Sequence, residues 1–282
     1  MERIEDIADA RLDLYARLTD VQLRSHVESE NGFFIAESAK VAARALDAGY
    51  EPISLVVPEH RLERERALVE RFEKQEGVDV FAVPGEQLEA LAGYEVTRGV
   101  LAAMRRKPLP SLGDLLEGAS RVAVLEGITN HANVGSVFRN AAALGVDAVL
   151  VSPDCSDPMY RRAIRVSMGT VFQVPWTRLE DDGGGWLGAA MEGLRRANFE
   201  TCAFALHDES VDLGDDRLAG IDRLAMFFGT EGTGLAQATI DACDHVVKIP
   251  MREGVDSLNV AATSAVAFWE LRSRDGRRGA RV

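Results

Sequence analysis

Apolar and polar positions change their pattern repeatedly along the chain. Short apolar runs, which suit buried strands, are followed by longer stretches in which apolar residues recur at every third or fourth position, which suits helices. In the first pair, the run at 33–36 precedes Ser38, a good helix cap, and the helical stretch then ends at Gly49. Because strands and helices alternate in this way along the sequence, we predict an α/β protein with mostly parallel sheets.

The same pattern predicts individual elements and two domains. The expected strands are 33–36, 53–57, 78–84, 121–127, 147–153, 171–176, 201–206, 225–229 and 245–250. The expected helices are 2–24, 39–49, 60–77, 136–145, 160–169 and 187–198. Prolines, glycines and a basic cluster between residues 105 and 119 are typical of a linker. We therefore expect a first domain at 1–106, a linker at 107–119 and a second domain at 120–282.

The stretch 249–270 differs from a surface helix. From Val260 to Trp269 it is apolar nearly all round, whereas a surface helix carries one apolar stripe. We therefore expect this helix to be buried. Ser257 and Asn259 lie directly before it, and buried polar groups cost free energy unless they find partners. Either the fold or a ligand must supply those partners.

Composition and charge narrow the class of protein. The 282 residues are 46% hydrophobic and 27% charged, which is ordinary for a globular protein. The net charge of −13 argues against a broad nucleic-acid-binding surface, so any contact with RNA is expected through local basic patches. Cys155, Cys202 and Cys243 lack paired spacing and suggest reduced thiols in a cytosolic protein. No signal peptide and no membrane-spanning run are expected.

Three stretches of the second domain place glycines and polar side chains between a strand and a helix. They are 125–140, 227–235 and 249–261. In open α/β sheets, ligands bind beyond the carboxyl ends of the strands, and glycines let the backbone approach a ligand closely. We therefore expect the three stretches to converge on one polar pocket. Each feature also has a plainer interpretation: the glycines as turns, Asn130 as a helix cap and Arg139 as a solvated charge.

These three stretches resemble the motifs of a known family. NVGSVFRNAAALG, FFGTEGTGL and IPMREGVDSLNVA are similar, in this order within 121–271, to the three motifs of the SpoU (TrmH-like) branch of the SPOUT RNA 2′-O-ribose methyltransferases. The segment 158–175 also resembles the part of that family between its first two motifs. Residues 32–57 and 97–103 resemble its substrate-binding domain more loosely.

The resemblance implies a fold, a reaction and partners. The implied fold is α/β, with a C-terminal α/β trefoil-knot methyltransferase domain and a smaller N-terminal L30e-like domain that binds substrate. The knot is a rare exception to the rule that chains do not thread themselves. The implied enzyme is a cytoplasmic homodimer, joined through the knotted domain, that uses S-adenosyl-L-methionine to methylate RNA and needs no metal or membrane. Ribosomal RNA is favoured over transfer RNA because the chain carries a separate N-terminal domain.

The resemblance also implies roles for single residues. The implied catalytic residues are Arg139, Asn133, Glu231, Ser257 and Asn259. The implied cofactor-binding residues are Gly229, Ile249, Leu258, Gly234, Pro250 and Met251. Because arginine scarcely deprotonates, Arg139 is expected to clamp phosphate and stabilise a developing alkoxide, and its action as a base stays open. Asn133 is expected to fix Arg139 or the ribose, and Glu231 to orient Arg139.

Candidate RNA contacts lie in local basic clusters. They are Arg105, Arg106, Lys107, Arg161, Arg162 and Arg165, with Arg272, Arg274, Arg277 and Arg278 in the tail. For each of these residues alone, a solvated surface charge is the simpler interpretation.

The sequence departs from the family pattern at a few positions. Gly254 lies one residue later than the usual glycine of the third motif, Ala261 occupies a position where serine is common, and Asn130-His131 replaces Asp-Pro. His131 is interpreted as a loop residue. Two alternatives stay open: a homologue that binds RNA or cofactor without turnover, and methylation of a base or of a substrate other than RNA. A plain nucleotide-binding enzyme is disfavoured because no phosphate loop is present.

Overall fold

The computed structural model describes residues 1–16, 31–92, 99–181, 185–207, 209–254 and 257–273. Its contacts divide the chain into two units. Unit 1 comprises Met1–Pro108 and Met159–Gln173, and unit 2 comprises Leu109–Pro158 and Val174–Val282. The division after Pro108 falls within the expected linker, whereas Met159–Gln173, which we expected in the second domain, packs with the first.

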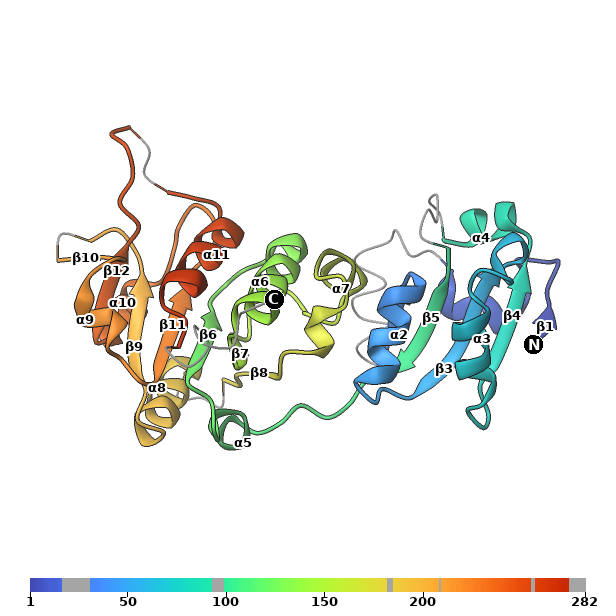
Figure 1. The fold of residues 1–282 in the computed structure, drawn as a ribbon, viewed down its shortest axis with the longest axis horizontal. Coiled ribbons are helices and arrows are strands. Elements are labelled where there is room, and N and C mark those ends of the chain that lie inside the picture. The colour runs from blue at the N-terminus through green and yellow to red at the C-terminus, as the bar shows by residue number, and fades with distance from the viewer. Residues whose placement is uncertain (17–30, 93–98, 182–184, 208, 255–256, 274–282) are drawn as a thin grey trace. The chain divides into compact units, whose positions relative to one another are not determined.

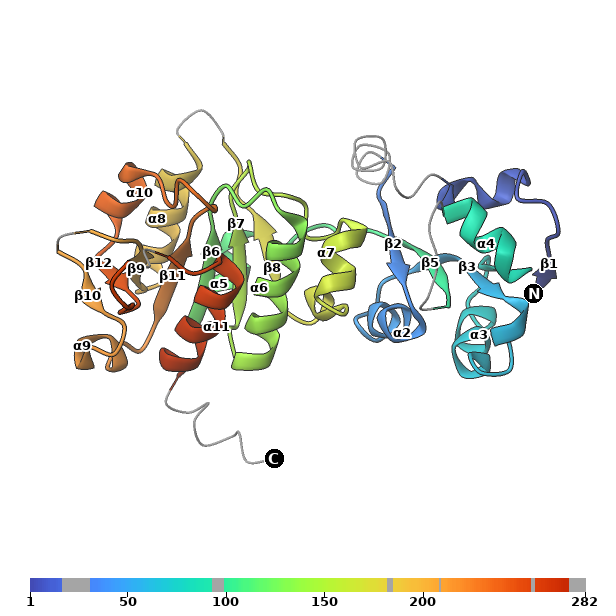
Figure 2. The same cartoon turned by 90° about the horizontal axis from the view of Figure 1, so that it is seen from above.

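Unit 1 is built on a five-stranded mixed sheet in the order β1-β4-β3-β5-β2. Its strands are β1 (Glu2–Arg3), β2 (Phe33–Glu37), β3 (Pro52–Pro58), β4 (Asp79–Val83) and β5 (Leu101–Arg105). Its helices are α2 (Ala39–Asp47), α3 (Arg66–Glu73), α4 (Gly85–Ala92) and α7 (Arg161–Val166), with 3-10 helices η1 (Ala10–Tyr15), η2 (Glu59–Arg61) and η3 (Thr170–Phe172). β1, β4 and β3 are parallel, and β5 is antiparallel to β3 and β2. Figures 1 and 2 show α2 and α3 on one face of this sheet and η1 and α4 on the other.

A buried tyrosine ties η1 to the sheet of unit 1. The pairing of β3 with β5 shifts register between Pro52 and Ser54. The hydroxyl of Tyr15 lies 2.7 Å from Ser54 Oγ at this irregularity and accepts a hydrogen bond from Ala103 N at 3.1 Å. Burial raises the pKa of Tyr15, so the hydroxyl keeps its proton. The side chain thereby satisfies backbone and side-chain groups that would otherwise be buried without partners.

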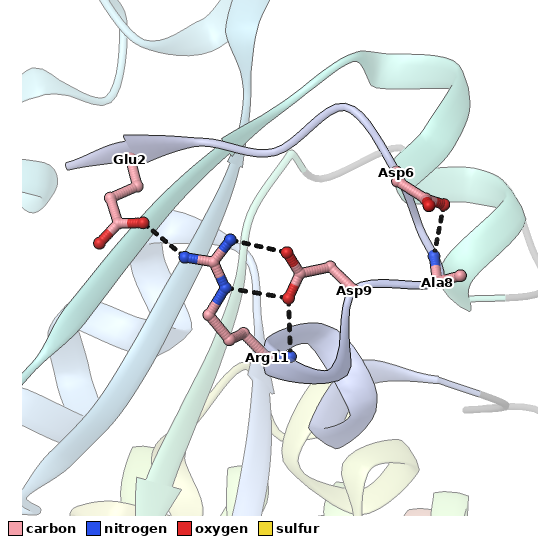
Figure 3. Close-up of polar contacts among 5 residues, drawn as sticks. All are labelled: Glu2, Asp6, Ala8, Asp9 and Arg11. Atoms are coloured by element: carbon pink, nitrogen blue, oxygen red, sulfur yellow. Dashed lines mark hydrogen bonds and ion pairs between the residues drawn. The ribbon is translucent and has the colours of Figure 1, made fainter.

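The amphipathic helix expected at 2–24 is wrong for the residues described. The chain forms the short strand β1 and then η1 instead. Asp6 and Asp9 each accept a hydrogen bond from the backbone N–H two residues further on, as Figure 3 shows. Such local bonds compete with the helical hydrogen bonds and turn the chain. Residues 17–24 of the expected helix lie outside the described residues.

Unit 2 is built on a seven-stranded sheet in the order β10-β12-β9-β11-β6-β7-β8. Its strands are β6 (Arg121–Leu125), β7 (Ala148–Val151), β8 (Trp176–Arg178), β9 (Glu200–Phe204), β10 (Val211–Asp212), β11 (Leu224–Phe228) and β12 (His245–Lys248). Its helices are α5 (Leu112–Leu116), α6 (His131–Leu144), α8 (Trp186–Arg196), α9 (Asp216–Ala219), α10 (Gln237–Ala242) and α11 (Val260–Glu270). The paired strands described in this sheet are all parallel. Figure 2 shows α6 and α11 on one face and α8 and α10 on the other.

Most expected elements are present with shifted ends, and one strand is wrong. α6 begins at His131, which is therefore helical, because Asn130 accepts a hydrogen bond from Ala132 N and caps the helix. The strand expected at 171–176 is a 3-10 helix at its start, and β8 begins only at Trp176. The Phe172 side chain packs within unit 1, where its ring centroid lies 5.2 Å from those of Phe34 and Tyr50. Tertiary packing here overrides a β-rich sequence.

The apolar helix α11 is buried on one side only. Ala267 and Phe268 are buried, and Ser264 accepts a hydrogen bond from Asn140 Nδ2 of α6 at 3.0 Å. Val266 is 41% exposed and Trp269 is 57% exposed, so the expectation of complete burial is wrong within a single chain. Among the described residues, no helix is long and apolar enough to cross a membrane.

Candidate active site

Side chains from three distant stretches of unit 2 meet in one hydrogen-bonded cluster. Asn133 Nδ2 donates to Glu231 Oε1 at 2.9 Å. Asn259 Nδ2 donates to Asn133 Oδ1 at 3.2 Å and also to Glu231 Oε1. The expected convergence of the three stretches is therefore present, and it links the first turn of α6, the loop after β11 and the start of α11.

Capped helix starts position the two asparagines of this cluster. α6 starts at the cap Asn130, so Asn133 lies in its first turn, where it is 8% exposed. Asn259 caps α11 by accepting from Ala261 N at 2.8 Å, which leaves its Nδ2 free to donate to the cluster. A carboxylate that accepts two amide hydrogen bonds is held in a defined orientation. Glu231 is therefore positioned by its neighbours although its loop lies at the surface.

The loop between β11 and α10 requires glycine for reasons of space and backbone conformation. A Cβ at Gly229 would lie 2.2 Å from the carbonyl carbon of Gly234 and 2.3 Å from Leu235 N, so no larger residue fits. Gly234 N donates to Thr230 O at 3.1 Å and closes the turn. Gly232 and Gly234 have φ values of 92° and 70°, in the left-handed region that favours glycine.

A pocket of about 630 Å³ lies beside this loop. Its lining includes the expected cofactor-binding residues Gly229, Gly234, Ile249, Met251 and Leu258, together with the expected catalytic residues Glu231, Ser257 and Asn259. Pro250 lies on a neighbouring depression instead. The volume is in the range of small-molecule sites. Glu231 and Lys248 are the charged side chains among the described residues that line it.

Aromatic rings form part of the pocket wall. Phe204 and Phe228, at the ends of β9 and β11, both line it and stack with centroids 4.7 Å apart and planes at 11°. Phe268 packs against Phe228 in a T-shaped contact, with centroids 5.5 Å apart and planes at 86°. Phe228 is thus held on both sides, and Phe204 is the half-buried member of the pair. Sequence reasoning missed Phe204 because a phenylalanine in a strand suggests only core packing.

Arg139 does not join the cluster. It is exposed on α6, and within the described part of the chain no hydrogen bond or ion pair connects it to Asn133 or Glu231. Six residues along a helix correspond to about 600° of rotation, so Asn133 and Arg139 point in different directions. The expected contacts from Asn133 and Glu231 to Arg139 are therefore not formed within this chain, and Glu231 accepts from two asparagines instead.

Several of the basic residues expected to contact RNA bond to other groups of unit 1. Arg106 donates to Phe33 O at 2.9 Å, and Lys107 donates to Ala48 O at 2.7 Å. Arg161 and Arg165 pair with the buried carboxylate of Glu37 in the same unit, at 3.3 and 3.8 Å. The exposed side chains of Arg105 and Arg162 make no hydrogen bond or ion pair with described residues.

Of the tail arginines, Arg272 lies within the described residues of unit 2. Arg272 stacks over Trp269, with its guanidinium carbon 3.9 Å from the ring centroid. Arg274, Arg277 and Arg278 lie outside the described residues.

The cysteines are free thiols that favour the neutral form. Cys155 and Cys202 are buried and Cys243 is partly buried. Burial raises the pKa of all three thiols, that of Cys243 to about 12. A nucleophilic role requires the thiolate, so none of the three suits one. Within the described ranges, no three His, Cys, Asp or Glu side chains gather as metal ligands do.

Comparisons with known proteins agree with this geometry. Residues 120–269 match the model of the SpoU rRNA Methylase family. An uncharacterized tRNA/rRNA methyltransferase of Mycobacterium tuberculosis strain H37Rv is 38% identical over 273 residues, covering 96% of this chain and 91% of the relative. The 23S rRNA (guanosine-2′-O-)-methyltransferase RlmB of Vibrio vulnificus is 35% identical over 204 residues, covering 69% of this chain and 77% of the relative. The crystal structure of an AdoMet-bound rRNA methyltransferase from Sinorhizobium meliloti aligns with a TM-score of 0.80 at 22% identity, covering 99% of this chain and 98% of that one.

Proposed function

Because this chain belongs to the SpoU rRNA methylase family, we propose that it transfers a methyl group from S-adenosylmethionine to a ribose 2′-hydroxyl of RNA. The observation that carries this proposal is the cluster of Asn133, Glu231 and Asn259 at the edge of a pocket closed by a glycine loop. Ribosomal RNA is the favoured substrate, since RlmB relatives are named for 23S rRNA.

The pocket residues suit the cofactor by their chemistry. Backbone groups at Gly229, Ile249 and Leu258 line a space large enough for it, and the half-buried ring of Phe204 offers a surface on which adenine stacks. Lys248, whose ammonium lies 3.8 Å from Asp212 Oδ1, is the cation on the wall that matches the carboxylate of the methionine part. When bound, the cofactor supplies an electrophilic methyl group on sulfur.

The polar cluster then orients the ribose. Glu231 Oε1 already accepts from two amides, so Oε2 is the oxygen that accepts a hydrogen bond from the ribose hydroxyl. Positioning the hydroxyl in line with the methyl group supplies much of the rate gain. Arg139 binds RNA phosphate and stabilises negative charge on the ribose oxygen. Because it does not reach the cluster of its own chain, we infer that it acts in the cluster of a second copy.

A homodimer provides that second copy. The exposed Val266 and Trp269 of α11 lie on the unit 2 helix that packs against α6, the helix that carries Arg139. Burying such a face removes apolar surface from water. The proposal therefore includes a homodimer through the knotted domain, in the cytoplasm. Light scattering of wild type and Trp269→Glu tests it: wild type is expected as a dimer and the variant as a monomer without methyl transfer.

The experiment that tests the activity is methyl transfer from labelled S-adenosylmethionine to total RNA. Arg139→Ala is expected to lower the rate about a hundredfold to a thousandfold, as loss of a charge-stabilising donor does elsewhere. Arg195→Ala, which removes an exposed arginine of α8, is the matched control and is expected to act like wild type. Nucleoside mass spectrometry then locates the methyl group, and label on a base or no label at all with wild type would refute the proposal.

A further inference from the structure

A single buried glutamate joins both ends of the glycine loop of unit 2. Glu126 directly follows β6, and its backbone N–H donates to Phe228 O at 2.9 Å, where the chain leaves β11 for the loop. Its side-chain Oε1 accepts from Ala236 N at 2.9 Å, where the chain leaves the loop for α10. The loop 229–235 is therefore fastened at its start by the backbone of Glu126 and at its end by the carboxylate.

This fastening bears directly on the cluster. Glu231 lies within the loop and accepts hydrogen bonds from Asn133 and Asn259 at the same time. A hydrogen bond between Gly234 and Thr230 closes the turn internally. The position of the turn therefore depends on where its two ends are held. A displacement of the end at Ala236 therefore changes the position of Glu231 relative to both asparagines.

The second carboxylate oxygen of Glu126, Oε2, indicates that holding this side chain in place costs folding free energy. Glu126 is 9% exposed, and its Oε2 is buried without a hydrogen-bond partner among the described residues. A buried carboxylate oxygen without a partner is destabilising, whereas an exposed helix end is capped more simply by serine or asparagine. The Ala236 side chain itself provides no cap. Groups held at a cost to stability are concentrated where function needs a fixed geometry.

We propose that Glu126 is a positioning residue for methyl transfer, which holds the glycine loop so that Glu231 stays within reach of Asn133 and Asn259. This inference rests on the proposed function, because it assigns Glu126 a purpose in that reaction. Glu126 does not line the pocket and acts through Ala236 and the loop.

A double-mutant cycle tests whether Glu126 acts through Glu231. Glu126→Ala is expected to lower the single-turnover rate about tenfold to a hundredfold, as small misplacements of reacting groups do. At saturating S-adenosylmethionine and in the background of Glu231→Ala, the same substitution is expected to leave the residual rate unchanged, because the group that it positions is already gone. Glu126→Gln keeps an oxygen that accepts from Ala236 N–H and is expected to recover most of the rate.

Two further measurements separate positioning from general destabilisation. Thr201→Val is the matched control, because Thr201 is buried in unit 2 and bonds to Asp244 Oδ2 at 2.8 Å away from the loop. It is expected to lower the melting temperature without changing the rate. Hydrogen exchange at 229–236 is expected to speed up in Glu126→Ala and not in Thr201→Val.

The outcomes are distinct. An equal loss of rate in both backgrounds, or unchanged hydrogen exchange in Glu126→Ala, overturns the inference about Glu126 while wild-type activity still supports the proposed function. A wild type that transfers no methyl group refutes the proposed function, and the hydrogen exchange then still decides whether Glu126 holds the loop.

Discussion

Each unit has a buried glutamate at the carboxyl end of a strand, and the two differ in what surrounds the charge. Glu37 ends β2 of unit 1, is 2% exposed and pairs with Arg161 and Arg165 of the same unit. Glu126 follows β6 of unit 2, bonds to a backbone N–H and has an oxygen without a partner in the described residues. A buried carboxylate paired with arginines serves the fold, whereas a buried carboxylate with one oxygen left without a hydrogen bond, next to the polar cluster, agrees with the positioning role proposed for Glu126.

The same contrast extends to the other polar side chains of the two units. In unit 1, Arg106 and Lys107 donate to backbone carbonyls of the unit itself. In unit 2, Asn133 and Asn259 donate hydrogen bonds from their amides to the carboxylate of another side chain, Glu231. Unit 1 therefore uses most of its described candidate RNA-binding cations to hold its own fold. Arg105 and Arg162 are the exposed exceptions.

The largest expected effect tests the structural role of Glu37. Glu37→Ala leaves two arginines without their carboxylate and is expected to cost unit 1 about 3 kcal/mol, the low end for a broken buried pair, because Arg165 is more than a third exposed. Urea unfolding measures it. The control Glu59→Ala breaks an exposed pair with Arg3 and is expected to cost about 0–1 kcal/mol. Equal costs for the two variants would remove the distinction drawn between the units.

The next effect tests the glycine loop of unit 2. Gly229→Ala forces a Cβ into the backbone of Gly234 and Leu235, so the loop must open. Binding of S-adenosylmethionine, measured by calorimetry, is expected to weaken about a hundredfold or more, since displaced binding groups cost this much. In Gly188→Ala of α8, no atom lies within 4 Å of the new Cβ, and the helix gains about 0.5–1 kcal/mol. Tight binding by Gly229→Ala would place the cofactor elsewhere.

A smaller effect tests the exposed cations of unit 1. Arg105→Ala and Arg162→Ala are each expected to weaken RNA binding a few-fold and to lower the slope of log K against log salt by about 1, as loss of one phosphate contact does. Filter binding at several salt concentrations measures this. Arg64→Ala, an exposed arginine beside Glu65 in the same unit, serves as the control. If Arg64→Ala changes the slope as much, the effect of the two arginines comes from the net charge of the protein and not from a contact with RNA phosphate.

Parts of this contrast could be predicted from the sequence. The three glycine-containing stretches each follow a strand, and the carboxyl ends of parallel strands lie at one edge, so their convergence follows from the pattern. The cap at Asn130 and the end of α6 at Gly145 follow from local chemistry in the same way. These features depend on neighbours close in sequence or on a general rule of sheet topology.

Other parts depend on contacts that no local pattern records. Glu126 meets Ala236 110 positions away, and without that contact it is one acidic residue among many. The strand expected at 171–176 is wrong because Phe172 packs with Phe34 and Tyr50. The expected pairing of Glu231 with Arg139 is not formed because the turn of α6 sends Arg139 away from the cluster.

The smallest effect compares one motif that occurs in both units. Asp9 of unit 1 and Asp215 of unit 2 each cap a helix and accept side-chain and backbone hydrogen bonds from the arginine two residues on, Arg11 and Arg217; Figure 3 shows the first. Those hydrogen bonds lower the pKa of both aspartates from 3.8 to about 2. As the pH falls, each aspartate therefore takes up its proton at a lower pH in the native state than in the unfolded chain. The stabilisation is present above pH 3.8 and is lost as the pH falls towards 2.

Substitution by asparagine isolates the charge, because asparagine still caps a helix. Asp9→Asn is expected to lower the melting temperature of unit 1 slightly at pH 7, and Asp215→Asn that of unit 2. Both differences are expected to shrink with added salt, because the pairs are exposed, and to become much smaller as the pH falls from 3.8 towards 2. Calorimetry from pH 2 to 7 measures them, with Asp216→Asn as the control next to Asp215. A difference that keeps its full pH 7 size at pH 2, where the native aspartates are about half protonated and the unfolded ones almost fully, would assign the effect to the cap and not to the charge. The two units would then share no electrostatic device at all.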